Sequence, residues 1–316
     1  MPSLPDFPDI AAYHVWRKEP SRWLPAALAI ARAHQLAHAE PHPFRTGTNL
    51  VVALDDKLIL KIFPPLLRAQ FVSERASLSQ LRGRLGVAVP EIVAQGEREG
   101  WPYLVITRLE GVLGSDVWSG MPEPDKERVL RQIGETVACV QRAPLGDLAL
   151  IEPRWESFMR KQIEGCRARH TRLGLPRKFL DGLDQFLAAS TPLIPMDAPP
   201  VILVGEYIPE NFLLSQDARG WQLSGLFDFG DVLAGWGEYD LLGPSAFMTA
   251  GVAPRVRSLL DGFGYSSAAF GSPLQQRLMA LMLLHRASDL VGHIRITGWQ
   301  DRARDFFELA ELLWPV

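Results

Sequence analysis

The sequence predicts an α+β fold of two lobes, in which a small antiparallel β-sheet lobe with a packed helix precedes a larger, mostly helical lobe. Its 316 residues exceed the roughly 150 of a typical single domain. Two pairs of short apolar runs, each joined by a polar turn, occur before residue 110, and helical periodicity dominates afterwards. We expect the first lobe to span residues 1–107, a hinge to span 108–111 and the second lobe to span 112–316.

In the first lobe, apolar residues recur at helical spacing from Ala11 to Ala37, and Pro20 interrupts them. A second helix is expected from about Ala69 to Arg84. Two hairpins are predicted because apolar runs flank polar turns. Their strands are expected at residues 49–54, 58–63, 92–95 and 103–109.

The second lobe combines long helices with a few short strands. Helical spacing of apolar residues predicts helices over 124–142, 155–173 and 177–189, and again within 273–314. A Pro-rich break separates the first three helices from three short apolar strands. These strands are expected at residues 201–204, 212–214 and 223–229.

The composition is that of a globular protein with its own apolar core. Hydrophobic residues make up 47% and charged residues 22%, which excludes a disordered chain, a coiled coil and a collagen-like fibre. Cys139 and Cys166 cannot form a disulfide framework and have no Cys or His neighbour at metal-ligand spacing. The N-terminus lacks signal-peptide features, and no apolar run approaches the roughly 20 residues that span a bilayer. We therefore expect a cytoplasmic protein without a membrane partner.

Charge is unevenly distributed although the net charge is only −3. Residues 1–108 carry 13 Lys+Arg and 10 Asp+Glu, and the remainder carries 20 and 26, so the two parts have net charges of +3 and −6. Such a chain is not a nucleic-acid binder by charge. The basic part suits an anionic ligand and the acidic part a cationic one, with ordinary surface scatter as the alternative.

The second half contains a carboxylate and an amide five residues apart, followed by another carboxylate. Glu206 and Asn211 bracket a loop between predicted strands, and Asp228 stands at the end of the next strand, in the tripeptide Asp-Phe-Gly. Asn211 and Asp228 offer the oxygen ligands that Mg²⁺ prefers. Glu206 is left to orient a hydroxyl and accept its proton, a division of roles typical of phosphoryl transfer by kinases.

The first half supplies groups suited to phosphate. Lys61 shares one side of its strand with apolar residues, and a half-buried lysine usually needs an anionic partner. Glu74, on the following helix, is placed to hold Lys61 toward a ligand's phosphates. The backbone of Thr46, Gly47, Thr48 and Asn49 precedes the first strand and is expected to cover phosphates.

Taken singly, each feature has a plain structural explanation: a lysine at a sheet edge, a solvated glutamate, or an ordinary Asp-Gly turn. Their order along the chain is more specific. A lysine in a strand, a glutamate on the next helix, a carboxylate-x4-Asn pair and an Asp-Phe-Gly tripeptide follow one another as in the protein-kinase signature set. This order favours a kinase-like protein.

Nearly the whole chain resembles the aminoglycoside phosphotransferase family, with its closest likeness to the hygromycin phosphotransferase branch. Residues 102–111, 209–214 and 225–231 resemble that family's hinge strand, catalytic loop and metal-binding strand. The resemblance implies a bilobal protein-kinase-like fold, ATP or GTP with Mg²⁺, and phosphorylation of a small-molecule hydroxyl. It also implies adenine binding by backbone groups around Thr107 to Leu109.

The catalytic loop departs from the family pattern. The family reads His-Gly-Asp, and this chain reads Val204-Gly205-Glu206. Glutamate keeps the carboxylate but extends it by about 1.5 Å, roughly one bond length. Val204 removes an imidazole that would brace the loop.

The resemblance places the acceptor site in the helical lobe, over the catalytic loop. Acidic residues there would suit a cationic acceptor, and tryptophans could form stacking walls. The candidates are Asp231, Glu238, Trp236 and Asp289, with Glu152, Glu156, Glu164, Asp261, Trp155 and Trp299 as further ones. Asp240 is expected to be a structural brace of the catalytic region.

Three functions remain open from the sequence. The first is a small-molecule O-kinase, acting on an aminoglycoside or related aminosugar. The second is a metabolic kinase of a choline-, homoserine- or sugar-like alcohol, because fold does not fix substrate. The third is a nucleotide-binding pseudokinase, which Val204 and Glu206 would favour. We expect no nucleic-acid partner, and a monomer or dimer.

Overall fold

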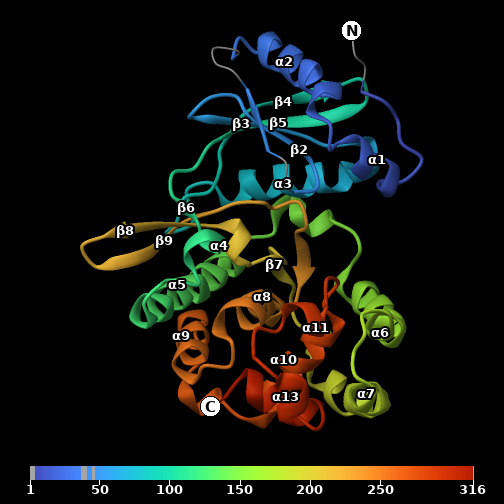
Figure 1. Ribbon diagram of the computed structural model, residues 1–316, viewed down its shortest axis with the longest axis vertical. Helices are drawn as coiled ribbons and strands as arrows, with labels where there is room; N and C mark the ends of the chain where they lie inside the picture. Colours follow the sequence, from blue (N-terminus) through green and yellow to red (C-terminus); the bar gives the residue numbers. More distant parts are fainter. Residues whose placement is uncertain (1–3, 37–40, 45–46, 316) are drawn as a thin grey trace. The chain divides into compact units, whose positions relative to one another are not determined.

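The computed structural model describes residues 4–36, 41–44 and 47–315, and it confirms the predicted α+β fold (Figure 1). The chain divides into two compact units. Unit 1 comprises Met1–Gly83, Ala88–Glu110 and Phe227–Val232, and unit 2 comprises Arg84–Val87, Gly111–Leu226 and Leu233–Val316, within the described ranges. The short segment Phe227–Val232 thus packs with residues that precede it by more than a hundred positions. The lobe and hinge boundaries expected from the sequence remain predictions.

Unit 1 contains an antiparallel sheet, which includes both predicted hairpins. Asp55 fixes the first turn, because its carboxylate accepts hydrogen bonds from Lys57 N and Leu58 N at 2.7 and 2.8 Å. The strand order is β1-β2-β3-β5-β4, so β5 lies between β3 and β4. The strands are β1 (His42–Pro43), β2 (Leu50–Ala53), β3 (Leu58–Ile62), β4 (Ile92–Arg98) and β5 (Trp101–Thr107).

Helices cover both faces of this sheet. Helix α2 (Leu24–Ala33) lies on one face and α3 (Arg68–Leu81) on the other (Figure 1). The single helix expected from residue 11 to 37 is interrupted as predicted at Pro20, because proline begins a short 3₁₀ turn after α1 (Ile10–Trp16). Trp23 and Trp101 are almost fully buried in the apolar core that these elements enclose.

Unit 2 is built mainly of helices. The apolar helix α10 (Ser272–Leu284) packs against α6 (Trp155–Arg172), α7 (Arg177–Ser190) and α13 (Phe306–Leu313). Helix α5 (Glu123–Arg142) packs against α9 (Ala253–Phe263) so closely that a Cβ on Gly134 would collide with the Leu259 carbonyl oxygen. The other helices are α4 (Gly114–Val117), α8 (Leu242–Pro244), α11 (Leu290–His293) and α12 (Trp299–Arg302). Across the described residues, every helix is too short or too polar to cross a bilayer.

Short strands in unit 2 carry the loops of interest. β7 (Val201–Leu203) pairs with β10 (Leu233–Gly235), and β6 (Val112–Leu113) pairs with the hairpin of β8 (Phe212–Asp217) and β9 (Gly220–Leu226). β9 was expected to continue to Phe229, but it ends at Leu226. The extended backbone cannot continue because Asp228 has a φ of 70°. Strands of two or three residues such as β1, β6 and β10 are too short to produce a sequence pattern.

Candidate active site

In unit 1, Lys61 and Glu74 form a buried ion pair. Lys61 lies on β3, and its Nζ donates hydrogen bonds to both carboxylate oxygens of Glu74 on α3, at 2.7 and 2.6 Å. The two side chains are 9% and 1% exposed. A buried lysine is stable only with such a partner, so the sequence expectation for this pair is met by direct contact.

Asp228 completes a cluster of three charges with this pair. Its Oδ1 lies 3.2 Å from Lys61 Nζ, and its side chain is 41% exposed. The φ of 70° places Asp228 in the left-handed region, which non-glycine residues seldom adopt and which is found mostly at functional sites. Phe229 is fully buried beside it and anchors the turn. One carboxylate is thus held open to solvent next to a buried ion pair.

The electrostatics of the cluster favour a charged lysine. Burial alone would lower the pKa of Lys61, but the negative charges of Asp228 and Glu74 outweigh burial and raise it. Burial raises the pKa of Glu74, and Lys61 opposes that rise. With all three groups ionised the cluster carries one net negative charge beside an ammonium, an arrangement that suits a cation bridged to phosphate.

A second polar chain in unit 1 links the segment before β2 to the segment around Asp228. Asn49 Nδ2 donates to Gln70 Oε1 at 3.1 Å, and Gln70 Nε2 donates to Asp231 Oδ2 at 3.5 Å. The buried Asn49 Oδ1 has no hydrogen-bond partner among the described residues. Gly47 and Thr48 are exposed just before it, whereas Thr46 lies outside the described residues.

The predicted adenine-binding backbone is partly engaged in the sheet of unit 1. Thr107 N donates to Glu91 O, and Thr107 Oγ1 accepts from Glu91 N, both at 2.9 Å. Arg108 N donates to Lys57 O at 2.7 Å. Leu109 follows the strand and is half-buried. The role of Thr107 and Leu109 in holding a base remains a prediction, and the donor of Thr107 is already used.

In unit 2, the loop that carries Glu206 is braced through its backbone. The Asp240 carboxylate accepts hydrogen bonds from Val204 N at 2.9 Å and Gly205 N at 2.8 Å. Asp240 is 2% exposed; burial raises its pKa to about 7, and the two backbone hydrogen bonds oppose the rise. The expectation that Asp240 is a structural brace is confirmed for the backbone of residues 204 and 205, whereas the catalytic role of this loop remains a prediction.

His285, which sequence reasoning missed, braces the same loop from another side. Its Nε2 lies 3.2 Å from Gly205 O, and its Nδ1 accepts from Ala287 N at 3.2 Å. Because Nδ1 is an acceptor, the proton resides on Nε2 and is donated to Gly205 O. The ring stacks on Tyr239 with a centroid distance of 4.4 Å. Burial lowers the pKa of His285 to about 3, so the imidazole is neutral. A lone histidine after an apolar helix carries no sequence signal for such a role.

Glu206 itself is half-buried, and its main chain is tied to Asn211. Asn211 Nδ2 donates to Glu206 O at 3.1 Å, and Ile208 N donates to the same oxygen at 3.0 Å. Asn211 is 6% exposed at the end of a short 3₁₀ turn. Since its amide nitrogen is used to hold the loop, the carbonyl oxygen is the atom that remains for a metal or a ligand.

The loop borders a cavity of about 230 Å³ in unit 2, referred to below as the Glu206 cavity. Its walls come from the loop after β7, from α8 and the π-helical turn Ser245–Thr249 that follows it, and from the end of α10 through α11. The lining residues are Gly205, Glu206, Ile208, Leu242, Gly243, Ala246, Phe247, Met282, His285, Ala287, Ser288, Asp289, Leu290, His293 and Ile294. A larger open groove of about 910 Å³ lies along α6, α7 and residues 191–198, and it is lined by other residues.

The predicted acceptor residues are dispersed. Asp289 lines the Glu206 cavity, and Asp231 belongs to unit 1. Glu238 is 1% exposed and receives hydrogen bonds from Arg277 at 2.6 Å on both oxygens, and from Trp236 Nε1 at 3.0 Å. A substrate would have to displace Arg277 to reach Glu238. Of the predicted acceptor residues, only Asp289 is therefore retained as a candidate.

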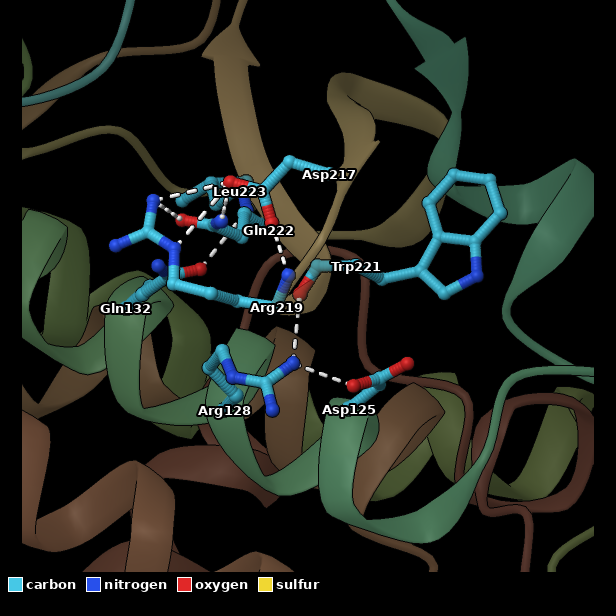
Figure 2. A network of polar contacts seen from close by, with 8 residues as sticks. All are labelled: Asp125, Arg128, Gln132, Asp217, Arg219, Trp221, Gln222 and Leu223. Carbon is cyan, nitrogen blue, oxygen red and sulfur yellow. Dashed lines mark hydrogen bonds and ion pairs between the residues drawn. The ribbon is translucent and has the colours of Figure 1, made fainter.

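A polar network holds the β8–β9 hairpin, which follows Asn211, to helix α5 (Figure 2). Arg128 donates to Trp221 O at 3.3 Å and to the Asp125 carboxylate. Leu223 N donates to Gln132 Oε1 at 2.8 Å. These contacts fix the backbone of β9, the second strand of the hairpin, to a long helix of unit 2.

The turn of this hairpin has a strict requirement for glycine. Gly220 has a φ of 102°, and a Cβ at this position would collide with the Asp125 carboxylate. Asp217 fixes the preceding residues by accepting a hydrogen bond from Arg219 N at 2.7 Å, as Figure 2 shows. The hairpin therefore combines a backbone constraint with side-chain contacts to α5.

The donor set fits a magnesium ion that is shared with a phosphate ligand. Among the described residues, no three His, Cys, Asp or Glu side chains converge as a metal site. Mg²⁺ typically takes one or two carboxylates and fills its remaining positions with phosphate oxygens and water. The half-open Asp228 carboxylate satisfies that requirement.

Known proteins share this fold. The GDP complex of wild-type aminoglycoside 2'-phosphotransferase-IIIa is 17% identical with a TM-score of 0.68, over 92% of this chain and 96% of that chain. Macrolide 2'-phosphotransferase MphH from Brachybacterium faecium is 17% identical with a TM-score of 0.57, over 93% and 98%. The streptomycin–ATP complex of APH(2")-IIa is 12% identical with a TM-score of 0.58, over 81% and 86%. At these identities the likeness establishes the fold.

The sequence also identifies the family of this chain. Residues 42–271 match the family described as the phosphotransferase enzyme family, and this match covers more than half of the chain. The predicted resemblance to the aminoglycoside phosphotransferases is thereby confirmed, whereas the finer likeness to the hygromycin branch remains a prediction. With Lys61, Glu74 and Asp228 in contact and Glu206 on a braced loop, this chain belongs to the phosphotransferase enzyme family.

Proposed function

We propose that this chain transfers the γ-phosphoryl group of ATP or GTP, with Mg²⁺, to a hydroxyl of a small molecule. The observation that carries the proposal is the contact of Lys61 with both Glu74 and Asp228 in unit 1. A permanently charged ammonium beside an exposed carboxylate provides one group for phosphate oxygens and one for a metal ion. Solved relatives in complex with GDP or ATP support nucleotide use.

On the nucleotide side, each residue of the cluster has a separate role. Glu74 holds Lys61 so that its ammonium meets the phosphates, and Asp228, with Asn211, supplies oxygen ligands for Mg²⁺. When bound, Mg²⁺ would neutralise charge that develops on the transferred phosphoryl group. The exposed Gly47 and Thr48 would cover the phosphates with backbone N–H groups, and backbone groups from Thr107 to Leu109 would hold the base.

On the acceptor side, Glu206 acts as the general base. Its carboxylate orients the acceptor hydroxyl and takes its proton as the oxygen attacks phosphorus. Asp240 and His285 hold the backbone on which Glu206 stands, so the longer side chain is presented from a fixed origin. A misplacement of about 1 Å can cost on the order of 100-fold in rate, which is why this bracing bears on activity.

The test is phosphate transfer from ATP and from GTP, in the presence of Mg²⁺, across a panel of hydroxyl acceptors that includes aminoglycosides and small alcohols. Asp228→Ala should abolish transfer and EDTA should have the same effect, because the half-exposed carboxylate is the main protein ligand for the metal. Thermal stability of Asp228→Ala provides the folding control. Transfer that persists in EDTA would refute the mechanism.

The pseudokinase is the alternative that Val204 and Glu206 favour. It predicts that ATP with Mg²⁺ raises the melting temperature while no acceptor is phosphorylated. A general base requires a fixed position, and the hydrogen bonds of Asp240 and His285 to the backbone of residues 204 and 205 provide a fixed support for Glu206, which supports the active enzyme.

A further inference from the structure

The Glu206 cavity is small. Its volume of about 230 Å³ is below the roughly 300–1,000 Å³ of pockets that hold drug-sized ligands. A cavity of this size holds several water molecules or one small ring with its substituents. A three-ring aminoglycoside would extend beyond it.

Most of the cavity wall is apolar. Leu242, Ala246 and Met282 are between 3% and 8% exposed, and Leu290 and Ile294 are buried as well. Ala246 belongs to the π-helical turn Ser245–Thr249, a rare conformation found frequently at functional sites. The wall therefore favours a ligand whose frame is hydrocarbon rather than one that carries a hydroxyl or amine on every carbon.

The polar groups of the wall are few. Glu206 and Asp289 contribute carboxylates, and Ser288 contributes a hydroxyl that is 5% exposed at the residue level and has no hydrogen-bond partner among the described residues. Burial lowers the pKa values of the two lining imidazoles, so they are neutral at neutral pH. The lining residues include no Lys or Arg among those described, so its formal charge is −2.

From its size, its apolar walls and its paired carboxylates, we propose that the Glu206 cavity binds a compact amino alcohol, a single small ring or short chain with one protonated amine. The hydroxyl faces Glu206 and the amine faces Asp289. This inference rests on the proposed function, because the hydroxyl at Glu206 is the one that is phosphorylated. Its oxygen bonds to the γ-phosphorus, the bond from that phosphorus to the nucleoside diphosphate breaks, and its proton passes to Glu206.

The experiment compares three probes: trans-4-aminocyclohexanol, cyclohexane-1,4-diol and kanamycin. Binding is measured by calorimetry, and phosphate transfer is measured with ATP and Mg²⁺. We expect the amino alcohol to bind at least about tenfold more tightly than the diol, which corresponds to 1.4 kcal/mol. Kanamycin should bind more weakly than the amino alcohol.

Asp289→Asn is the matched variant, because Asp289 also caps α11 through Gly292 N and asparagine is an equally good cap. It should weaken amino alcohol binding by at least about tenfold and leave diol binding unchanged. Asp305→Asn, at the cap of α13, is the control for a cap outside the cavity and should change neither. The inference is overturned if kanamycin binds more tightly than the amino alcohol, or if Asp289→Asn affects amine and diol alike. Binding of the amino alcohol without any transfer would uphold the cavity and refute the proposed kinase activity.

His285 is the basis of a second inference, which is independent of the first. Gly205 donates its N–H to Asp240 and receives the Nε2 proton of His285 on its carbonyl, so both peptides that flank it are fixed. Glu206 follows directly. The imidazole is fixed in turn by Ala287 N and by its stacking on Tyr239. We infer that His285 is a positioning residue that fixes the origin of the Glu206 side chain, in place of the imidazole that Val204 lacks.

The test uses His285→Gln, which retains a donor near the Nε2 position, and His285→Phe, which keeps a ring over Tyr239 but cannot donate. His285→Phe should lower kcat by about 10- to 100-fold with the nucleotide KM unchanged, and His285→Gln should remain within about threefold of wild type. His170→Phe is the control, because the buried His170 makes a similar bond to Leu283 O away from the loop. It should lower stability without lowering kcat. Equal kcat losses in both His285 variants, or none, would overturn the inference.

Discussion

The two units hold their functional groups in opposite ways. In unit 1, side chains hold one another: the ammonium of Lys61 is bonded to the carboxylates of Glu74 and Asp228. In unit 2, side chains hold the main chain: Asp240 and His285 bind the backbone of residues 204 and 205, and the Glu206 side chain extends from that support. The charge cluster keeps its geometry only if every one of its side chains is present. The position of the braced loop depends instead on the side chains that bind its backbone.

This difference explains where the chain departs from the family pattern. Lys61, Glu74 and Asp228 follow the expected order without change, and the departures fall at Val204 and Glu206. Residue 204 contributes only its N–H to the brace, so its side chain can vary. The comparison predicts that substitutions in the cluster are severe and that substitutions in the loop are graded.

Lys61→Met should produce the largest effect. It removes the ammonium that meets the phosphates and leaves Glu74, 1% exposed, without its partner. Breaking a buried pair in this way costs about 3–5 kcal/mol, and phosphate transfer should fall below detection. Chemical denaturation and single-turnover transfer would measure the two losses. The double variant Lys61→Met/Glu74→Gln is the control: it should recover much of the stability and none of the activity.

Glu206→Gln should reduce kcat by roughly 10²–10⁴-fold, because it keeps shape but loses basicity. Nucleotide affinity should hardly change, since in the proposed mechanism Glu206 contacts the acceptor hydroxyl and not the phosphates. Glu206→Asp tests whether the loop is adapted to the longer side chain. If the braces set the backbone for the longer side chain, aspartate retracts the carboxylate and should be slower than glutamate. A faster Glu206→Asp enzyme would show instead that glutamate is a weakened base.

The pH dependence of stability tests the His285 brace. The pKa of His285 is lowered to about 3, first by burial and then by Arg286, with Arg169 and His293 adding to it. Between about pH 6.5 and 3 the unfolded chain binds a proton that the folded chain does not, so this histidine reduces stability as pH falls, by at most about 1.4 kcal/mol per pH unit. His285→Gln removes this term.

From pH 6.5 to 4.5, the free energy of unfolding of His285→Gln should therefore fall by about 2–3 kcal/mol less than that of wild type. Asp240 contributes with the opposite sign, because its raised pKa of about 7 means that the folded state binds the extra proton, but its contribution cancels between the two proteins. Parallel curves for the two proteins would contradict a buried neutral imidazole.

The smallest effect concerns the turn of the β8–β9 hairpin in unit 2. Gly220→Ala should destabilise the protein by about 1–3 kcal/mol, because alanine is strained at a φ of 102° and collides with Asp125. Arg219→Ala, at the neighbouring exposed position, is the control and should change stability by less than about 0.5 kcal/mol. Equal effects would show that the positive φ of Gly220 and its contact with Asp125 impose no special requirement for glycine.

Sequence reasoning succeeded where signals are local or ordered along the chain. The two hairpins of unit 1 and the long helices followed from periodicity, and the Lys61–Glu74 pair followed from a lysine in an apolar strand. It could not identify His285 or Ser288, which reach the cavity through folding alone and carry no motif. The end of β9 at Leu226 was missed because the left-handed backbone of Asp228 is imposed by its surroundings and not by its residue type.

The segment Phe227–Val232 belongs to unit 1, but it is encoded 117 residues after that unit's preceding segment ends at Glu110. On a ribosome that adds about 5–20 residues per second, unit 1 would wait roughly 6–23 s for its last segment. During that interval Lys61 has Glu74 but not Asp228. The charge cluster is therefore assembled in two stages, and a gene fragment that stops at residue 110 encodes a lobe without the Asp228 carboxylate.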